Sequence, residues 1–203
     1  MQLLAISVGK IKNLIAENNA NTNADNRIVA SAIDKQPIST TESPIPVTVR
    51  FLGLEQDEQA DLRVHGGEEK AIYAYPIEHY EFWQDQRSIH GKNQQKLNFG
   101  AMGENFTTKG FTEEDVFVGD HWRIGDVILE VVKFREPCFK FNIKMGWSTA
   151  AKAMVQSGHS GWYLKVIRNG KIAAGNTIEV IPGERKLSIK KQSDQYYNLQ
   201  SLL

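Results

Sequence analysis

The stretch GENFTTKGFTEEDVFVGDHWRIGDVILEVVKF, residues 103–134, decides the fold. Within it, short runs rich in valine, isoleucine, threonine and aromatic residues alternate with glycines, a pattern typical of short β-strands joined by tight turns. The runs that we expect to be strands are Asn105 to Thr108, Val116 to Val118, His121 to Ile124 and Val127 to Phe134. Short strands separated by glycine-containing turns favour a β-barrel.

Working outward toward the N-terminus, the pattern predicts three more strands and a helix. Met1 to Gly9 and Ala71 to Tyr75 are apolar runs, and Val47 to Phe51 alternates apolar and polar residues with the period of a half-buried strand. Pro76 suits the first position of a helix, and apolar residues at helical spacing carry that helix to about Arg87.

Two segments between these elements are predicted to be loops. Lys12 to Pro46 is rich in Asn, Thr, Ser, Ala and Pro and is expected to be mostly loop, with a short strand near Ile28 to Ile33. Gly53 to Lys70 is dense in charge and glycine, so we expect an ordered loop there.

Toward the C-terminus, the pattern predicts a helical segment and a hairpin. Pro137 to Gln156 is expected to be helical, broken in two at Gly146. The dipeptide Asn169-Gly170 is typical of a type I′ turn, and it lies between two strand-like runs, Trp162 to Ile167 and Lys171 to Ala174. The pattern therefore predicts a β-hairpin.

Ile178 to Ile181 is the last expected strand, and the polar tail beyond it is either a short docking helix or a partly disordered segment. Many short strands with a few inserted helices do not make the regular alternation of a doubly wound sheet. We therefore expect an α+β fold with a β-barrel core of short, mostly antiparallel strands.

The barrel domain is expected over residues 1–183, followed by a tail over residues 184–203.

Composition excludes several classes of protein. The 203 residues carry 24 Lys plus Arg and 24 Asp plus Glu, so we expect no overall positive field that would attract nucleic acid or a membrane surface. No window approaches the ~20 apolar residues of a membrane span, and the start lacks a signal peptide, so we expect a cytoplasmic protein. A single cysteine, Cys138, excludes an internal disulfide and a cysteine-rich metal module.

One candidate site is the group His65, Gly66, Gly67 and Lys70. Adjacent glycines let backbone N–H groups approach an anion, and a lysine three residues later adds charge. The motif alone favours the alternative interpretation, a tight turn with charged neighbours, because Gly-Gly is a common turn dipeptide.

A second candidate is Cys138 with Arg135, at the junction between a strand and an expected helix start. An arginine and a helix start favour the thiolate, the form required of a nucleophile, a sulfur carrier or a soft metal ligand. The alternative is a buried structural cysteine. Asn105, in a turn that enters a strand, is a weaker third candidate that could bind a ligand or satisfy the loop backbone.

The order of these motifs resembles the MOSC domain, the module at the C-terminus of molybdenum cofactor sulfurases and in free-standing bacterial proteins. The similarity is strongest to the free-standing branch that includes the hydroxylaminopurine-resistance protein. The segments that carry the resemblance are Gly53 to Asp61, His65 to Ala71, Gly103 to Thr107, Val118 to Asp120, Leu129 to Val131, Arg135, Pro137-Cys138 and Gly161 to Tyr163.

The resemblance implies a β-barrel that binds or transfers the molybdenum cofactor (molybdopterin) or its sulfur. It implies that Cys138 is the metal ligand or persulfide carrier. His65, Gly66, Gly67, Lys70 and Asn105 would line the cofactor site, with Arg135 as a phosphate clamp. The tail resembles the start of a truncated helical extension. Pyridoxal phosphate belongs to a sulfurase domain that this chain lacks, so it is not expected here.

Three functions follow from the resemblance. The favoured hypothesis is a molybdenum cofactor-dependent oxidoreductase that reduces or detoxifies N-hydroxylated bases, small-molecule substrates, with electrons from a separate reductase, because no flavin, nicotinamide or iron–sulfur motif is visible. The second is a carrier that delivers sulfur or cofactor to an acceptor molybdoenzyme. The third is a binding module without a redox role.

Overall fold

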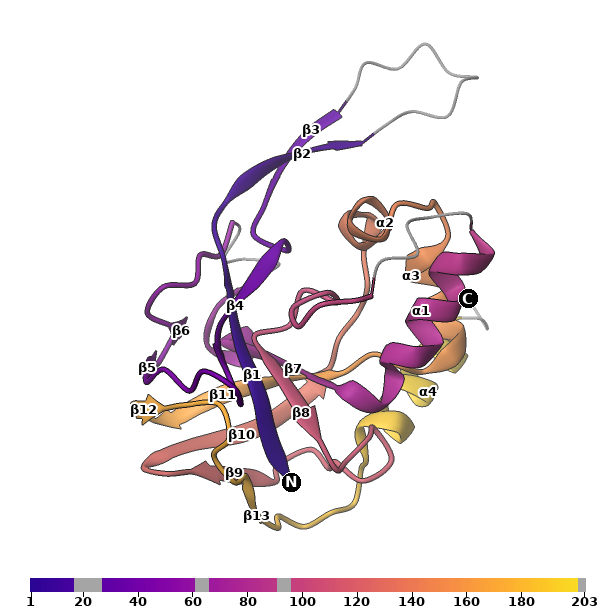
Figure 1. The fold of residues 1–203 in the computed structure, drawn as a ribbon. Coiled ribbons are helices and arrows are strands. Elements are labelled where there is room, and N and C mark those ends of the chain that lie inside the picture. The colour runs from indigo at the N-terminus through magenta and orange to yellow at the C-terminus, as the bar shows by residue number, and fades with distance from the viewer. Residues whose placement is uncertain (17–26, 61–65, 91–95, 201–203) are drawn as a thin grey trace.

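The structure is a computed structural model that describes residues 1–16, 27–60, 66–90 and 96–200 (Figure 1). Its strands are β1 (Gln2–Gly9), β2 (Lys12–Ala16), β3 (Arg27–Ser31), β4 (Lys35–Thr40), β5 (Val47–Arg50), β6 (Gly53–Leu54), β7 (Ile72–Pro76), β8 (Phe106–Lys109), β9 (His121–Ile124), β10 (Val127–Phe134), β11 (Trp162–Arg168), β12 (Gly170–Ile172) and β13 (Glu179–Ile181). Its helices are α1 (Tyr80–Ile89), α2 (Phe139–Met145), α3 (Ala150–Ser157) and α4 (Ile189–Gln200), with short 3₁₀ turns at Glu68–Lys70 and Ile77–His79.

The main sheet has eight strands in the order β13-β9-β10-β11-β7-β8-β1-β4. Every neighbouring pair in it is antiparallel except β7 and β8, which are parallel. The sheet curls into a half-barrel, β5, β6 and β12 form a smaller sheet at its side, and the β2–β3 hairpin projects from the body (Figure 1). The expected α+β fold with a barrel-like core of mostly antiparallel strands is confirmed.

Strand β7 joins two hydrophobic cores because successive side chains of a strand point to opposite faces. Ile72 and Ala74 pack in the barrel core with Trp122 and Trp162. Tyr73 and Tyr75, from the same strand, pack in a second core beneath the helices. All five residues of the strand are therefore buried, which explains its unbroken apolar run.

The second core holds three helices on the sheet. Trp83 of α1 and Phe141 of α2 have ring centroids 5.3 Å apart, and Met154 of α3 belongs to the same cluster. The full burial of these large side chains stabilises the fold by roughly 1.5–3 kcal/mol each. This packing fixes α2, and thereby the chain that precedes it, against the sheet.

The C-terminal segment ends in helix α4, which packs on β10. Tyr196 and Tyr197 lie against Phe134, with ring centroids 5.3 and 5.7 Å apart, and Ile189 is fully buried in the barrel core. The tail is thus helical over residues 189–200.

The prediction that Lys12 to Pro46 is mostly loop was wrong. The segment contains β2, β3 and β4, and Leu14 and Ile15 pair with Val29 and Ile28. The signal was weak because β4 is an edge strand of polar residues, which pairs with β1 through its backbone and leaves much of its side-chain surface outside the core.

The predicted hairpin at Asn169-Gly170 was also wrong. β12 pairs with β5, Ile172 opposite Val47, while β11 pairs with β10 and β7. Gly170 does not adopt the positive φ that a type I′ turn requires, and a Cβ there would lie 3.1 Å from Val127 Cγ2. The chain therefore leaves one sheet at this dipeptide and enters another.

Two smaller predictions need correction. Val116 to Val118 forms only an isolated bridge, between Phe117 and Ser188, because its partner is the irregular chain before α4. Pro76 ends β7, where it pairs with Thr108, so the helix begins at Tyr80 after a 3₁₀ turn. In contrast, the predicted bounds of β9 and β10 are those observed, and Gly146 breaks the next helical segment in a left-handed conformation.

Candidate functional site

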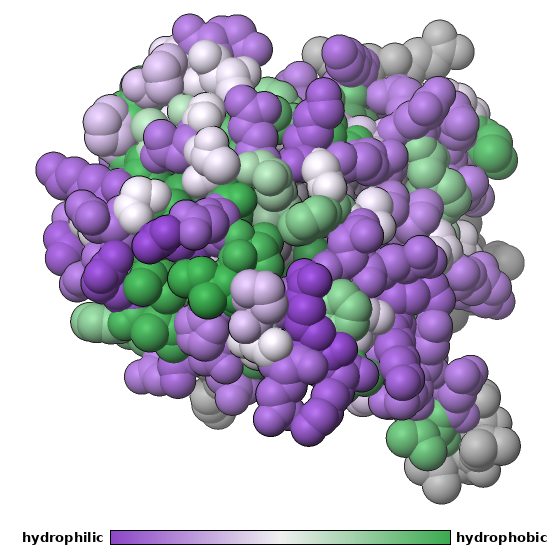
Figure 2. All heavy atoms as spheres, turned by 90° about the horizontal axis from the view of Figure 1, so that it is seen from below, coloured by the Kyte–Doolittle hydropathy of each residue, from purple (hydrophilic) through white to green (hydrophobic). Residues whose placement is uncertain are grey.

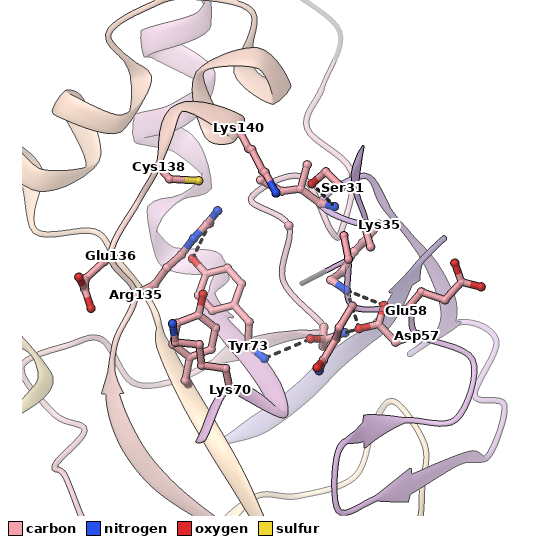
Figure 3. A pocket seen from close by; sticks show the side chains of 17 residues that line it. Ser31, Lys35, Asp57, Glu58, Lys70, Tyr73, Arg135, Glu136, Cys138 and Lys140 are labelled. Atoms are coloured by element: carbon pink, nitrogen blue, oxygen red, sulfur yellow. Dashed lines mark hydrogen bonds and ion pairs between the residues drawn. The ribbon is translucent and has the colours of Figure 1, made fainter. Parts of the chain in front are cut away.

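A pocket of about 100 Å³ lies between the hairpin side of the molecule and the start of α2 (Figure 3). Its walls come from segments far apart in the sequence: the chain after β3, the loop after β6, β7, the loop before β8, and the junction of β10 with α2. The lining residues are Ser31, Ala32, Ile33, Lys35, Asp57, Glu58, Gln59, Ala60, Lys70, Tyr73, Gly103, Asn105, Arg135, Glu136, Cys138, Lys140 and Tyr163.

Cys138 is placed at the pocket by the end of a strand and the start of a helix. β10 ends at Phe134, Pro137 cannot donate a backbone hydrogen bond, and α2 begins at Phe139. Cys138 is half-buried, and its sulfur points toward the pocket in Figure 3. It is the one thiol in the sequence, so it is the softest donor that lines this pocket.

A close approach of three strands supports this junction. The amide of Arg135 donates to the Gly161 carbonyl oxygen at 3.3 Å. Gly161 has a φ of 62°, and a Cβ there would lie 2.5 Å from the carbonyl oxygen of Ala74. Only glycine therefore lets the chain before β11 pass this close to β7.

Arg135 is a buried cation with neutral partners. Its Nη1 donates to the Met102 carbonyl oxygen at 2.6 Å and to the Tyr73 hydroxyl at 3.2 Å, and its guanidinium lies over the rings of Tyr73 and Phe141 at 4.7 and 5.0 Å. Burial alone would lower its pKa, but the Tyr73 and Tyr163 hydroxyls more than offset this effect, so the pKa is raised. The positive charge is retained without a carboxylate among the partners described.

Glu104 holds the loop that presents the Met102 carbonyl. This fully buried carboxylate accepts from the amides of Gly100 and Met102 at 2.8 and 2.9 Å, from Thr107 at 2.8 Å, and from the Tyr80 hydroxyl. Four donors satisfy its charge. Its role is therefore to fix the loop.

The opposite side of the pocket is built around an ion pair. Lys35 Nζ lies 2.5 and 2.7 Å from the two carboxylate oxygens of Asp57, and both side chains are nearly buried. Asp57 also accepts from the Gly9 amide at 2.7 Å and from Asn105 Nδ2 at 2.9 Å. Burial lowers the pKa of Lys35, and Asp57 offsets part of this effect.

Two further lysines border the pocket. Lys140, on the first turn of α2, donates to the Ala30 carbonyl oxygen at 3.2 Å and ties that helix to the hairpin. Lys70 lies 5.8 Å from the centre of the Tyr163 ring, and burial is the main cause that lowers its pKa. Both lie on the pocket wall with Arg135.

Of the residues expected at the site from the sequence, the structure brings together Lys70, Asn105, Arg135 and Cys138. Asn105 satisfies the fold around it: its Oδ1 accepts from the Tyr73 amide at 3.1 Å, and its Nδ2 donates to Asp57.

The glycine pair stands apart from these residues. Gly66 and Gly67 do not line the pocket, and the Gly67 amide donates to Gln59 at 3.2 Å. His65 lies outside the described residues.

Sequence reasoning missed Lys35, Tyr73 and Lys140 as pocket residues. Tyr163 belongs to a segment that carried the resemblance, but it was given no role at the site. Lys140 carried a usable signal, because it follows the candidate cysteine by two positions near an expected helix start. Lys35 had none, because its segment was expected to be mostly loop. Asp57 lies in a segment that carried the resemblance, Gly53 to Asp61, but it was given no role at the site.

Figure 2 shows the face of the molecule that is seen from below. On that face, apolar side chains gather in the left half of the view and hydrophilic ones surround them. Lysine, arginine, carboxylate and tyrosine side chains dominate the pocket. Within the described residues, no three His, Cys, Asp or Glu side chains group to hold a metal ion, and no helix is long and apolar enough to cross a membrane.

The comparison with known families decides the identity of this domain. Residues 61–179 match the MOSC domain. The chain belongs to the MOSC domain family. MOSC domains are associated with binding of the molybdenum cofactor, so the function of this chain is related to that cofactor.

Individual relatives extend the match. The chain is 34% identical to protein YiiM of Escherichia coli over 160 residues, which cover 74% of this chain and 70% of that protein. It is 36% identical over 154 residues to a protein of Gibberella moniliformis named reductase, covering 75% of this chain and 26% of that protein. The crystal structure of YiiM from Geobacillus stearothermophilus superposes with a TM-score of 0.74 at 32% identity and covers 98% of this chain and 85% of that one.

Proposed function

We propose that this chain binds the molybdenum cofactor in the Cys138 pocket and reduces N-hydroxylated compounds. The observation that carries the proposal is one thiol facing a pocket beside a buried arginine that has no carboxylate partner among the described residues. A soft thiolate is a suitable ligand for molybdenum, and a guanidinium is suited to a phosphate. The relative named reductase supports a redox role.

The donor set fits the group that the family binds. Cys138 is the one soft ligand, so the cofactor's own sulfur atoms would supply the others. Lys70, Arg135 and Lys140 supply positive charge around it, although the chain as a whole is neutral. When bound, the cofactor supplies two-electron chemistry at molybdenum.

The residues of the chain hold, orient and shield the reactants. Arg135 is fixed by hydrogen bonds and ring contacts, so it meets a phosphate without losing side-chain freedom. Tyr163 is partly exposed, and its ring lies 5.4 Å from that of the buried Tyr73, so Tyr163 offers an aromatic surface on which a flat base can pack.

The reaction balances with an external electron donor. Reduction of R–NHOH to R–NH₂ takes up two electrons and two protons, breaks the N–O bond and releases water. We propose that a separate flavin or iron–sulfur reductase supplies the electrons and that the reaction occurs in the cytoplasm.

Cofactor retention is the first test. The protein is purified from a host that makes the cofactor, and molybdenum and oxidised pterin are measured for the parent and for Cys138→Ser. Loss of molybdenum with an unchanged unfolding curve is the expected result. Ser157→Ala, on α3, is the control for purification losses. A serine variant with full molybdenum content contradicts the proposal.

A second test separates an enzyme from a carrier, since the half-buried thiol that would bind a metal is also open to an acceptor. Multiple turnovers of an N-hydroxylated purine with an added reductase, abolished in Cys138→Ser, support the enzyme. Stoichiometric loss of a persulfide from Cys138, as an acceptor molybdoenzyme gains activity, supports the carrier and overturns the enzyme.

A further inference from the structure

A second hollow, of about 190 Å³, lies beside the Cys138 pocket. It is bordered by the loop before β8, by the end of α1 and by the last turn of α2. Its lining residues are Lys35, Gln36, Arg87, Lys96, Leu97, Asn98, Phe99, Ala101, Lys144 and Met145. This volume exceeds the ~30 Å³ of one water molecule several-fold, enough for a hydrated anion.

The described lining of this hollow holds four cations and no carboxylate. Lys35 is paired with Asp57, and Lys144 with Asp34 at 2.9 Å. Arg87 and Lys96 provide the remaining positive charge, so the hollow is electropositive even after its ion pairs are counted.

Arg87 has an unsatisfied hydrogen-bond donor. Its Nε is buried, and no described residue accepts a hydrogen bond from it. A buried donor without an acceptor is costly, and an oxyanion in the hollow would remove that cost once the guanidinium turns its Nε toward it. Because a guanidinium presents its donors as a planar fork, two phosphate oxygens are a well-matched partner.

The hollow and the Cys138 pocket share one basic surface. Lys35 lines both. Lys140 lines the first and Lys144 the second, and these two residues are one helical turn apart on α2. A ligand whose reactive end occupies the first pocket can thus place an anionic end in the second.

We propose that the hollow at Arg87 and Lys96 binds a phosphate or diphosphate group of a ligand held in the Cys138 pocket. The link to that pocket rests on the proposed function. The phosphate belongs either to a phosphorylated substrate, such as the nucleotide form of an N-hydroxylated base, or to a second phosphate of the cofactor. Both sources share the same chemistry at this hollow.

Phosphate binding itself is tested without cofactor. Pyrophosphate is titrated by calorimetry into the cofactor-free chain, the Arg87→Gln/Lys96→Gln double variant and the control Lys152→Gln, an exposed lysine outside both pockets. The double variant should bind about 10- to 100-fold more weakly, while the Lys152→Gln control binds like the parent. Arg87→Lys should recover only part of the loss. A double variant with parental affinity and a parental unfolding curve overturns the proposal.

The source of the phosphate is tested on protein that carries cofactor. If the substrate supplies it, the double variant keeps its molybdenum and loses the preference in kcat/KM for an N-hydroxylated nucleotide over its nucleoside. If the cofactor supplies it, molybdenum content falls instead. Unchanged content together with unchanged preference overturns the link to the Cys138 pocket. Failure of the proposed function gives a different result, since pyrophosphate would still bind while Cys138→Ser kept its molybdenum.

Discussion

Two buried cations lie on opposite sides of the pocket and differ in how they are neutralised (Figure 3). Lys35 has a carboxylate, Asp57, within 2.5 Å. Arg135 has a carbonyl, a hydroxyl and two ring faces. The first charge is cancelled inside the protein and serves the fold, whereas the second retains a field that an external anion can use. Within one pocket, Lys35 therefore contributes to stability and Arg135 to anion binding.

The largest expected effect comes from breaking the ion pair. Asp57→Asn leaves Lys35 buried without a counter-charge and should lower the free energy of unfolding by about 3 kcal/mol. Urea denaturation measures this loss. Adding Lys35→Met to the same chain should restore most of it, because the buried charge is then gone. A single variant as stable as the parent would contradict the assignment of this side to stability.

Arg135→Gln tests the other side. The amide of glutamine can still donate to the Met102 carbonyl, so the fold should lose less than in Asp57→Asn. Affinity for the cofactor should fall about 10- to 100-fold, as expected for loss of a charge-assisted contact worth about 1.5 to 3 kcal/mol. Pterin retention during dialysis measures this change. Retention equal to that of the parent would remove Arg135 from the binding site.

The stability of the fold is expected to depend on pH through His159. His159 stacks on His79 with ring centroids 3.7 Å apart, and burial followed by the nearby His79 lowers the pKa of His159 to about 4. Its unfolded pKa is about 6.5, so between these values the unfolded chain binds more protons. Stability from this group is full above about pH 6.5 and declines as the pH falls toward 4.

The size of this effect is on the order of 1 kcal/mol, because the ring is only partly buried and solvent screens part of its charge. Urea denaturation at pH 7 and pH 5 should show a smaller pH-dependent loss for His159→Gln than for the parent. Equal losses in both proteins would show that the histidine does not titrate as described.

The smallest expected effect is at Lys140. Lys140→Gln should weaken cofactor binding only a few-fold, because its Nζ already donates to the Ala30 carbonyl oxygen and a glutamine amide can still make that contact. Lys152→Gln is the matched control. A loss as large as that of Arg135→Gln would mean that Lys140 contributes as much to cofactor binding as Arg135 does.

Local patterns predicted the parts of the fold that local physics determines. β10 was predictable because its alternating apolar residues face the barrel core, and Cys138 was noticed because proline and a helix start follow a strand there. The pairing of β12 with β5 was not predictable from the Asn-Gly dipeptide, since strand choice depends on distant residues. The Lys35–Asp57 pair was not predictable either, because the two residues are 22 positions apart and no local pattern links them.

The β2–β3 hairpin gives the site an adjustable wall. Ser31, Ala32 and Ile33 line the pocket, yet the hairpin strands pair only with each other and leave the eight-stranded sheet intact. Changes in the length of a surface hairpin carry a small entropic cost, because closure entropy grows slowly with loop length. Evolution can therefore reshape the entrance, and with it the range of molecules admitted, while the barrel and the Cys138 junction are inherited unchanged.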